Sequence, residues 1–355
     1  MMENRMLHDD RRAVPAREVS APARGEAPIV WDRATTAAAI GFGPLVDALR
    51  TAVVEYQAGL IHSPERLSVP LAEGGVALSM PASAADIAIH KLVNVQPANA
   101  RHGRPTLHGI VTLIDTATGE ILCGLDGPEV TGRRTAGISL LAMATFLPTA
   151  PEEIVLIGTG AQAAHHVAGI HALYPGCRVL VRGIDPGQVE AFCQRHGVCH
   201  PSLAPCPDII PESAQVVITL TTSKEVVYDL PASPGRLVIG VGAFRPDMAE
   251  IGSTTLHGSR LFADDPAGAR HEAGDLLRAG VDWQTVLPLA AAISKPPSGH
   301  PVVVKSVGTA AWDLAAARVA RSSLQQAARR PNGPVFPPGQ PATPKNGVAA
   351  HDFRA

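Results

Sequence analysis

The stretch Gly158-Thr159-Gly160-Ala161-Gln162-Ala163 decides the fold of this chain. It follows an apolar run, Glu153–Ile157, which predicts a buried strand, and it opens a helical pattern that reaches about Leu173. In such a turn the first glycine allows a tight bend, and the second lets the backbone approach a diphosphate. The small third residue lets the helix pack closely, and the diphosphate binds at the helix N-terminus. The stretch therefore predicts a Rossmann dinucleotide site.

Strands and helices continue to alternate after Pro151, so the turn belongs to a larger domain. We expect one more helix and four more strands, at Pro186–Arg195 and at Arg178–Val181, Val216–Leu220, Arg236–Val241 and Arg260–Ala263 respectively. Alternation of this kind implies a parallel sheet with right-handed crossovers. The dinucleotide-binding domain is expected to span residues 148–305.

The end of the second Rossmann strand indicates which dinucleotide binds. An NAD site usually has an acidic residue there, which accepts a hydrogen bond from the ribose 2′-hydroxyl. This chain has Val181-Arg182-Gly183, and the first acid is Asp185. A guanidinium can bind a 2′-phosphate that a carboxylate would repel. Arg182 therefore favours NADPH, with NADH still possible, and the alternative is a solvated arginine at a strand end.

The residues before this domain have a different pattern. Helices are expected at about Ala34–Gln57 and Gly132–Thr145, and strands at Arg66–Leu71, Val76–Met80, His90–Val95, Leu107–Asp115 and Ile121–Leu125. Such runs predict an α+β unit with an antiparallel or mixed sheet. A last helix, at about Thr309–Gln326, is expected to return to it, so that residues 29–147 and 306–328 form one domain.

Neither end of the chain is expected to contribute to the chemistry. Residues 1–28 are polar and rich in Arg, Ala and Pro, which predicts a disordered extension. Residues 329–355 contain repeated prolines, which exclude a helix or a central strand and predict a disordered tail.

Composition excludes several classes of function. Only 17% of the residues are charged and the formal net charge is -2, so no basic surface is expected for nucleic acid or an anionic membrane. The longest apolar stretch, Ile138–Leu147, is shorter than the roughly 20 residues that span a bilayer. The five cysteines form no C-x-x-C pair, so we expect reduced thiols and no metal site. The chain is expected to be cytoplasmic.

Four cationic side chains in the first domain stand out among few charges. Arg66 opens a strand, Lys91 begins the segment Lys91–Asn99, and Arg133 and Arg134 lie at a helix start. Together with other segments they resemble the ornithine cyclodeaminase/mu-crystallin family. The segments that carry the resemblance are Met80-Pro81, Lys91–Asn99, Thr131–Ala136, Gly158–Ala163, Gly242–Ile251 and Lys305-Ser306-Val307-Gly308.

The resemblance implies a homodimer in which a Rossmann domain is inserted into a substrate-binding and dimerisation domain. It implies that Arg66 and Arg134 bind a substrate carboxylate, with Lys91 beside them and Thr106 lining the site. A guanidinium matches a carboxylate with its planar fork. Two such neighbours are expected to lower the pKa of Lys91 and equip it for a catalytic proton transfer. Further cofactor contacts are expected at position 220, which is Leu220, and at Gly242 and Ser306.

One segment departs from the cyclodeaminases of this family. They are expected to carry an aspartate after the fourth Rossmann strand, where this chain has Phe244 in Gly242–Ile251. Phenylalanine can neither accept a proton nor pair with the amine of ornithine, but an apolar wall suits the methylenes of a cyclic imine. Phe244 and Arg182 therefore favour an NADPH-dependent reductase of cyclic ketimine carboxylates. The motifs resemble those of bacterial reductases that convert Δ1-piperideine-2-carboxylate to L-pipecolate and Δ1-pyrroline-2-carboxylate to L-proline.

Two alternatives remain open. One is an ornithine cyclodeaminase or amino-acid dehydrogenase on the same scaffold. The other is a non-catalytic protein that binds NADPH, although nucleotide binding alone needs none of Arg66, Lys91 or Arg134. Three histidines, His90, His165 and His166, are interpreted as structural or solvated, because hydride transfer to a preformed imine needs no His/Asp pair. Asp86 is a further possible acid, in a segment with a helical pattern.

Overall fold

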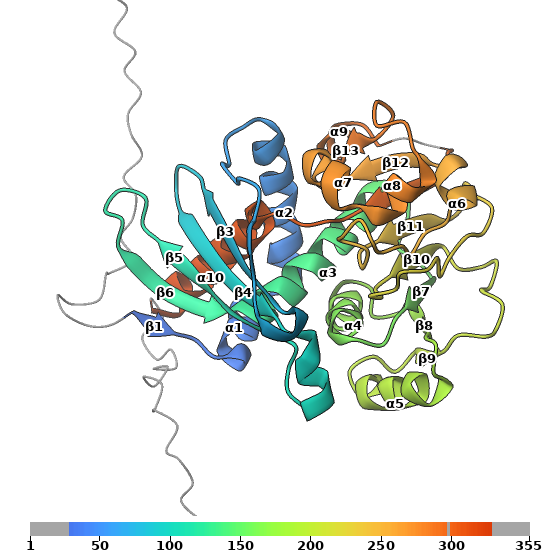
Figure 1. The fold of residues 1–355 in the computed structure, drawn as a ribbon, viewed down its shortest axis with the longest axis horizontal. Helices are drawn as coiled ribbons and strands as arrows, with labels where there is room; N and C mark the ends of the chain where they lie inside the picture. The colour runs from blue at the N-terminus through green and yellow to red at the C-terminus, as the bar shows by residue number, and fades with distance from the viewer. Residues whose placement is uncertain (1–27, 297–298, 329–355) are drawn as a thin grey trace, which may run out of the picture.

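A computed structural model describes residues 28–296 and 299–328 of the chain. Two sheets lie side by side with helices between and around them (Figure 1). The expected N-terminal extension, apart from Pro28, and the expected proline-rich tail lie outside the described residues.

The first sheet has six strands in the order β1-β6-β5-β4-β3-β2. The strands are β1 (Ile29–Val30), β2 (Leu67–Pro70), β3 (Val76–Ser83), β4 (Ala88–Val95), β5 (Leu107–Ile114) and β6 (Ile121–Asp126). Strands β2 to β6 pair antiparallel, and β1 pairs parallel with β6, so the sheet is mixed as predicted. One row of paired residues, Met80, Lys91, Val111 and Leu125, runs across its buried face.

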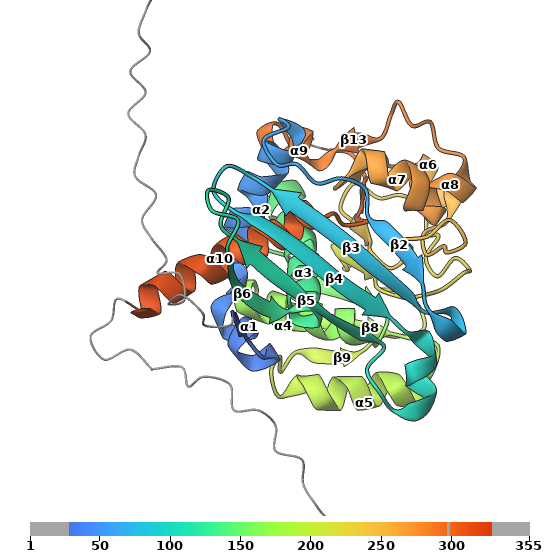
Figure 2. The same ribbon diagram turned by 60° about the vertical axis from the view of Figure 1, so that its left-hand side comes forward.

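Helices cover that buried face and leave the other face open in the described part of the chain (Figure 2). They are α1 (Arg33–Ala39), α2 (Phe42–Gln57), α3 (Gly127–Phe146) and α10 (Ala310–Ala328), and short 3₁₀ turns lie at Ala72–Gly74 and Pro97–His102. Helix α10 packs against α2, α3, β3 and β4, which confirms that the last helix returns to the first domain.

The helix expected at Ala34–Gln57 is in fact two helices. The chain leaves helical geometry at Ile40 and Gly41, and α2 begins at Phe42. Pro44 gives the reason, because proline fits the first turn of a helix but lacks the N–H that an interior position needs. No single helix of the described ranges is long and apolar enough to cross a membrane; α1 and α2 jointly reach the required length and composition, with a bend of 70° between them.

The second sheet has eight parallel strands in the order β13-β12-β14-β11-β10-β7-β8-β9. The strands are β7 (Glu153–Ile157), β8 (Arg178–Arg182), β9 (Leu203–Pro205), β10 (Val216–Thr219), β11 (Leu237–Gly240), β12 (Arg260–Ala263), β13 (Leu287–Pro288) and β14 (Val302–Lys305). The helices of this half are α4 (Ala161–Leu173), α5 (Pro186–Gly197), α6 (Ser253–His257), α7 (Pro266–Glu272), α8 (Gly274–Ala279) and α9 (Leu289–Ser294). The predicted Rossmann domain is confirmed.

Three strands of this sheet were not predicted. Strands β9 and β13 are short, and β14 contains the run Val302-Val303-Val304, which the chain reaches after β12 only through three further helices, α7, α8 and α9. It is fully buried between β11 and β12. The end of β14 is also where the chain turns into the segment that leads to α10.

The two halves share a continuous apolar core. Helix α3 of the first half packs on α4 of the second, and Gly169 allows this approach because a side chain there would meet Leu140 at 2.8 Å. The rings of Phe146 and Phe262 lie 4.9 Å apart across the same boundary. The largest fully buried side chain, Trp312 on α10, belongs to this core. The halves are therefore held in one arrangement by packing.

Candidate functional site

The glycine-rich turn has the geometry that a diphosphate requires. Gly158 has a φ of 130°, and a Cβ there would meet the carbonyl oxygen of Leu220 at 2.8 Å. Gly160 caps α4 without a side-chain hydrogen bond, and nothing lies within 4 Å of a Cβ built on it. Ala163 is fully buried and lets α4 approach the sheet. The open space at the helix N-terminus fits the diphosphate of a dinucleotide.

The other residues of the turn, Thr159, Ala161 and Gln162, are half-buried or exposed. Thr159 is half-buried, and Ala161 is exposed at the start of α4. The backbone carbonyl of Gln162 accepts a hydrogen bond from Nδ1 of His166 at 2.8 Å. The Oε1 atom of Gln162 is buried and has no hydrogen-bond partner among the described residues.

Arg182 lies at the carboxyl end of β8, next to the turn. Its carbonyl accepts a hydrogen bond from the backbone N–H of Gly158 at 2.8 Å. A Cβ on the following residue, Gly183, would contact Thr159 at 3.4 Å. The side chain of Arg182 is half-buried. It is therefore beside the predicted ribose position, where its role in choosing the dinucleotide stays a prediction.

The residue at position 220 is a buried leucine directly after β10, so its side chain offers no hydrogen bond, and its expected contact with the cofactor stays a prediction. Its neighbours Thr219 and Thr221 carry hydroxyls, but both donate to Glu250, at 2.9 and 2.8 Å. The N–H of Gly242 also donates to Glu250, at 2.6 Å. Glu250 thus joins the ends of β10 and β11.

Glu250 is fully buried and was not among the predicted site residues. Burial raises the pKa of its carboxyl group, whereas Lys305 and the donors from Thr221 lower it. Nζ of Lys305 lies 2.7 Å from Asp275, which also accepts a hydrogen bond from the N–H of Ile251 at 3.1 Å. These buried charges fix the loops at the carboxyl edge of the Rossmann sheet. The sequence sign that could have indicated Glu250 is its place directly before the apolar Ile251, in the segment that follows β11.

Ser306 lies between β14 and α10 and is buried. Its hydroxyl donates to Asp264 at 2.8 Å. The same carboxylate accepts hydrogen bonds from the N–H groups of Val307 and Gly308, at 2.9 and 3.1 Å, and from Nε1 of Trp312 at 3.0 Å. We call this arrangement the Asp264 cluster. The hydroxyl of Ser306 is therefore already bonded, and its expected contact with the cofactor stays a prediction.

Lys91 and Arg134 meet in the interior on one carboxylate, that of Asp313. Nζ of Lys91 lies 3.0 and 3.2 Å from the two oxygens of Asp313, and Nε of Arg134 lies 3.3 Å from one of them. Asp313 is fully buried and Lys91 is 1% exposed. We call these three residues the buried ion cluster. The two cations were predicted from the sequence. Asp313 was not, because it is a single acid in an otherwise apolar turn of α10.

The pKa of Lys91 is lowered to about 8. Burial is the largest cause, because the charged form loses hydration, and the guanidiniums of Arg134 and Arg66 add to it. The carboxylate of Asp313 acts in the opposite direction. The predicted effect of neighbouring guanidiniums is confirmed in direction, but desolvation is the greater cause.

Arg66 approaches the buried ion cluster through Gly308. Its guanidinium donates to the carbonyl of Gly308 at 2.9 Å and forms an ion pair with Glu272 at 2.7 Å. Gly308 has a φ of 78°, and a Cβ there would meet Cζ of Arg134 at 3.1 Å. Glycine is therefore required on both counts. Two of the three expected carboxylate-binding cations, Arg66 and Arg134, therefore meet at Gly308, and the third, Lys91, joins Arg134 on Asp313.

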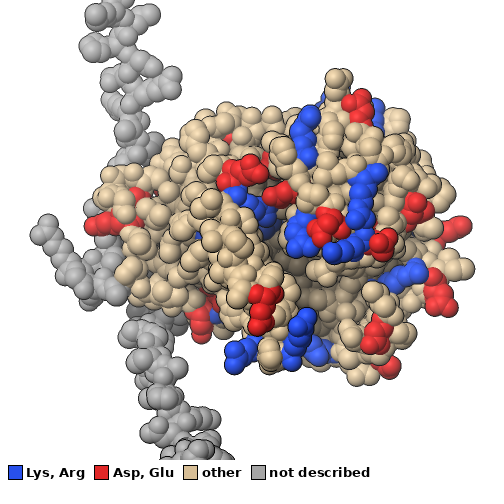
Figure 3. Space-filling model, in the orientation of Figure 1, with Lys and Arg blue, Asp and Glu red and all other residues tan. Residues whose placement is uncertain are grey.

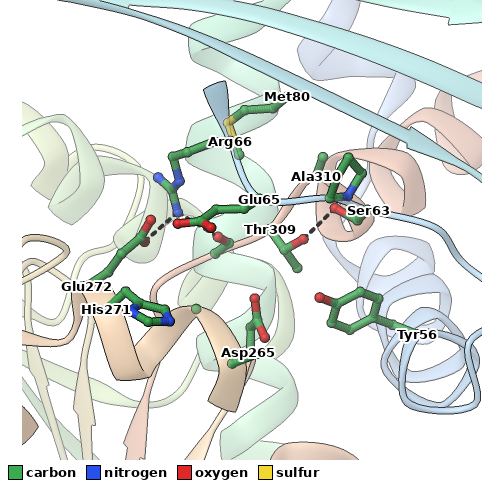
Figure 4. Close-up of a pocket in the computed structure, with 14 residues that line it drawn as sticks. Tyr56, Ser63, Glu65, Arg66, Met80, Asp265, His271, Glu272, Thr309 and Ala310 are labelled. Carbon is green, nitrogen blue, oxygen red and sulfur yellow. Dashed lines mark hydrogen bonds and ion pairs between the residues drawn. The ribbon is translucent and has the colours of Figure 1, made fainter. Parts of the chain in front are cut away.

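A cleft of about 270 Å³ opens beside Arg66. Figure 4 shows Tyr56 and Asp265 facing one another across it, with Arg66 and Glu272 at one end and the hydrogen-bonded pair Ser63 and Thr309 at the other. Burial and the neighbouring Asp264 raise the pKa of Asp265. On the face drawn in Figure 3, acidic and basic side chains are interspersed and no single-sign field appears.

Thr106 and Asp86, two of the remaining candidates, lie outside this arrangement. Thr106 is exposed in the bend before β5 and does not line the cleft, so its role in the site stays a prediction. The helical setting inferred for Asp86 is wrong, because the residue lies in the turn between β3 and β4. The carboxylate of Asp86 forms ion pairs with Arg318 and Arg321 of α10.

The three histidines have partners that suit structural roles. Nε2 of His166 lies 2.9 Å from the hydroxyl of Ser139, and burial lowers the pKa of the histidine to about 4. His165 lies against Gly132 between α3 and α4, and His90 pairs with Ser79. Phe244 is half-buried in the loop after β11, at the carboxyl edge of the Rossmann sheet.

Fold and site together define a class of protein. It is a Rossmann-type dinucleotide-binding protein. Its second domain supplies a set of buried cations beside the carboxyl edge of the Rossmann sheet. The chain belongs to the ornithine cyclodeaminase/mu-crystallin family, which it matches over residues 32–327.

Individual relatives support this membership. A Δ1-pyrroline-2-carboxylate/Δ1-piperideine-2-carboxylate reductase of Azospirillum brasilense is 52% identical over 303 residues, covering 85% of this chain and 97% of the relative. The ketimine reductase mu-crystallin of Mus musculus is 27% identical over 289 residues, covering 79% and 91% of the two chains. The structure of a Thermococcus litoralis Δ1-pyrroline-2-carboxylate reductase, in complex with NADH and L-proline, aligns with a TM-score of 0.76 at 22% identity, covering 84% and 98%.

Proposed function

We propose that this chain is an NADPH-dependent reductase of cyclic ketimine carboxylates. It would convert Δ1-piperideine-2-carboxylate to L-pipecolate and Δ1-pyrroline-2-carboxylate to L-proline, within lysine degradation and proline metabolism. The observation that carries the proposal is the grouping of three cations beside the carboxyl edge of a dinucleotide-binding sheet: Arg66 and Arg134 meet at Gly308, and Lys91 shares Asp313 with Arg134. The names of relatives that are 52% identical support the same substrates.

The cations would bind the carboxylate of the substrate. Arg66 is the most accessible of them, and its side chain is 18% exposed. A substrate carboxylate would replace Glu272 at Arg66, whose guanidinium can offer it two parallel N–H donors, and the charges of Lys91 and Arg134 nearby would add to the attraction. Fixed orientation holds the C=N carbon toward the nicotinamide position, which lowers the entropic part of the barrier.

The bound dinucleotide supplies a hydride, and the chain must stabilise the protonated imine that accepts it. Cations close to an iminium raise its energy, so the substrate carboxylate must offset them locally. Lys91 is the candidate for moving a proton, because its pKa of about 8 leaves both of its forms accessible near neutral pH. The lowered pKa comes mainly from burial.

The preference for NADPH rests on Arg182. This half-buried residue is the last of β8, at the strand end that reaches the ribose in Rossmann domains. The nearest acid, Asp185, accepts hydrogen bonds from Gly187 and Gln188 as the cap of α5, so it is committed to that helix. A 2′-phosphate would therefore meet a guanidinium rather than a carboxylate.

Ornithine cyclodeamination is the second candidate function, and Phe244 counts against it. The loop after β11 presents an aromatic ring where an acid would have to pair with the amine of ornithine. A non-catalytic NADPH-binding protein is the third. Such a protein would have no use for the buried charges of Lys91, Arg134 and Asp313. Burying charges costs free energy, which pairing them only partly offsets.

We also propose a homodimer formed through the open face of the six-stranded sheet. Large apolar side chains are exposed there: Leu67, Val69 and Leu92 are 64%, 49% and 41% exposed. Leu67 and Leu92 both pair with Ser79, so they share one face. An exposed apolar sheet face of this kind is typical of an association surface. Light scattering together with a Leu92→Glu variant would test it.

The domain limits and the location of the protein are proposals of the same kind. Residues 148–305 would form the dinucleotide-binding domain, and residues 29–147 with 306–328 the substrate-binding domain. All five cysteines are free thiols, which suits the reducing cytoplasm.

The central experiment follows the oxidation of NADPH and, separately, NADH with freshly prepared Δ1-piperideine-2-carboxylate. Release of ammonia from ornithine is measured in parallel. We expect imine reduction, faster with NADPH, and no ammonia. Ammonia without imine reduction would reject the proposal, whereas equal use of both dinucleotides would reject only the role of Arg182.

A further inference from the structure

We infer that Asp313 is a positioning residue for substrate binding: it holds Lys91 and Arg134 in place and balances their charge until a substrate carboxylate arrives. The inference rests on the proposed function, because it assumes that the cations bind a carboxylate. Asp313 reaches the site from α10, which lies far along the chain from Lys91 on β4 and Arg134 on α3. One carboxylate therefore links three elements.

The geometry favours positioning over an incidental contact. Both oxygens of Asp313 contact Nζ of Lys91, at 3.0 and 3.2 Å, and one also lies 3.3 Å from Nε of Arg134. Nε of Arg134 is buried and has no better partner among the described residues. The remaining nitrogens of that guanidinium lie against Gly308, whose carbonyl binds Arg66. Asp313 thus holds the side of Arg134 that faces away from Arg66.

Stability alone does not explain such a cluster. Taking charges out of water costs more than a single pairing usually returns, and buried ion pairs can often be replaced by apolar residues without loss. Asp313 is fully buried in an otherwise apolar part of α10, with Leu314 and Ala315 beside it. A buried carboxylate at this place is better explained by what it does for the cations.

The charge balance points to one ligand. Within the buried ion cluster, Lys91 and Arg134 are both paired with the one carboxylate of Asp313, so the cluster keeps one positive charge, which one ligand carboxylate would neutralise. The acids beside Arg66, which are Glu272, Asp265 and Glu65, line the cleft instead. Without Asp313, burial and two guanidiniums would act on Lys91 unopposed, so its ammonium would lose its proton at lower pH. Asp313 thereby keeps Lys91 cationic.

The test compares wild type with Asp313→Asn, which keeps the shape and removes the charge. The probe is pyrrole-2-carboxylate, a planar ring carboxylate without a reducible C=N bond, titrated calorimetrically at pH 6 and pH 8. We expect the dissociation constant of the variant to rise roughly tenfold at pH 8, since hydrogen bonds to charged groups are worth about that factor or more. At pH 6 most of the affinity should return, because Lys91 regains its proton.

A matched control and a second variant keep the test decisive. Asp86→Asn removes an acid that also pairs with α10, but far from the cations, and should bind the probe like wild type at both pH values. Asp313→Glu keeps the charge and lengthens the side chain. It should weaken binding severalfold at both pH values, with no shift in the pH dependence. NADPH binding and the melting temperature report on the fold of each variant.

Each outcome bears on the inference. Asp313→Asn binding that equals wild type, or that is weakened equally at both pH values, would overturn the charge role. An Asp313→Glu protein that binds like wild type would overturn the positioning role. Wild type that binds the probe but does not reduce the imine rejects the proposed function alone. Wild type that binds no ring carboxylate rejects both.

Discussion

Helix α10 carries two ion clusters that differ in burial. Near its start, Asp313 pairs with Lys91 and Arg134, and the side chains are 0%, 1% and 10% exposed. Five residues later, Arg318 pairs with Glu55 and Asp86, and their side chains are 19%, 28% and 40% exposed. We call the second group the surface ion cluster; Arg321 adds another contact to Asp86.

The difference in burial separates two uses of charge. Water screens the charges of the surface ion cluster, so each of its ion pairs contributes little to the stability of the fold. Their main effect is to link the β3–β4 turn to α10. The buried ion cluster lacks that screening, and each of its members strongly changes the ionisation of the others. Charges that must respond to a ligand belong in the buried group. The following variants test that distinction, beginning with the largest expected effect.

Replacing Lys91 with methionine should have the largest effect. The change leaves Asp313 paired only with Arg134 and removes one cation from the site. Losing one partner of a buried charge pair costs about 2–5 kcal/mol, so kcat/KM for the cyclic imine should fall by about thirtyfold or more. Steady-state kinetics provide the measurement. Turnover equal to wild type would exclude Lys91 from both binding and proton transfer.

Gly308→Ala should disturb the same cluster through the backbone. The residue has a φ of 78°, which costs a non-glycine residue about 1–3 kcal/mol, and the methyl group would press on Arg134. We expect a lower melting temperature and a higher KM. Gly280→Ala is the matched control, because it has a φ of 63° but open space around its Cβ position. Equal KM values in the two variants would contradict the contact with Arg134.

The pH dependence of binding should follow the ammonium of Lys91. Its pKa is lowered to about 8, mainly by burial, so the cation is present below that pH and is lost above it. Affinity for pyrrole-2-carboxylate should therefore fall as pH rises past 8, by up to about tenfold per unit. Lys91→Arg should remove this alkaline loss, since arginine stays charged. An unchanged alkaline loss in that variant would assign the titration to another group.

Asp86→Asn should have the smallest effect. The variant would lose the ion pairs of Asp86 with Arg318 and Arg321, each of which contributes about 0–1 kcal/mol to the free energy of unfolding. We expect a slightly lower melting temperature, a difference that shrinks in high salt, and unchanged kinetics. If kcat/KM fell as well, the two clusters would not be independent, and the separation drawn between them would be wrong.

The sequence allowed the Rossmann half to be predicted because its pattern is local. The strand at Glu153–Ile157 matches the observed β7, and the turn at Gly158–Ala163 has the expected glycine geometry. Strand β14 was missed because Val302–Lys305 gains its neighbours β11 and β12 only through tertiary contacts. The single helix expected at Ala34–Gln57 failed because one proline outweighed a continuous apolar pattern.

In the site, sequence motifs identified the cations but not their counter-ions. Lys91 and Arg134 lie in recognisable segments, whereas Asp313 is one acid in an alanine-rich helix. Its role depends on the direction in which α10 faces β4, which no local pattern encodes. Glu272, the partner of Arg66, was missed for the same reason.

The Asp264 cluster has a mechanical consequence for the whole enzyme. The chain returns from the Rossmann half to the substrate half through Ser306–Gly308, and one buried carboxylate holds that crossing at three consecutive residues and at Trp312 beyond it. A rotation of one half against the other at this crossing would break four hydrogen bonds at once. We therefore expect Ser306–Gly308 to be a rigid connection between the two halves and not a hinge. Substrate entry is then expected to use shorter movements near the cleft, such as the release of Glu272 from its ion pair with Arg66.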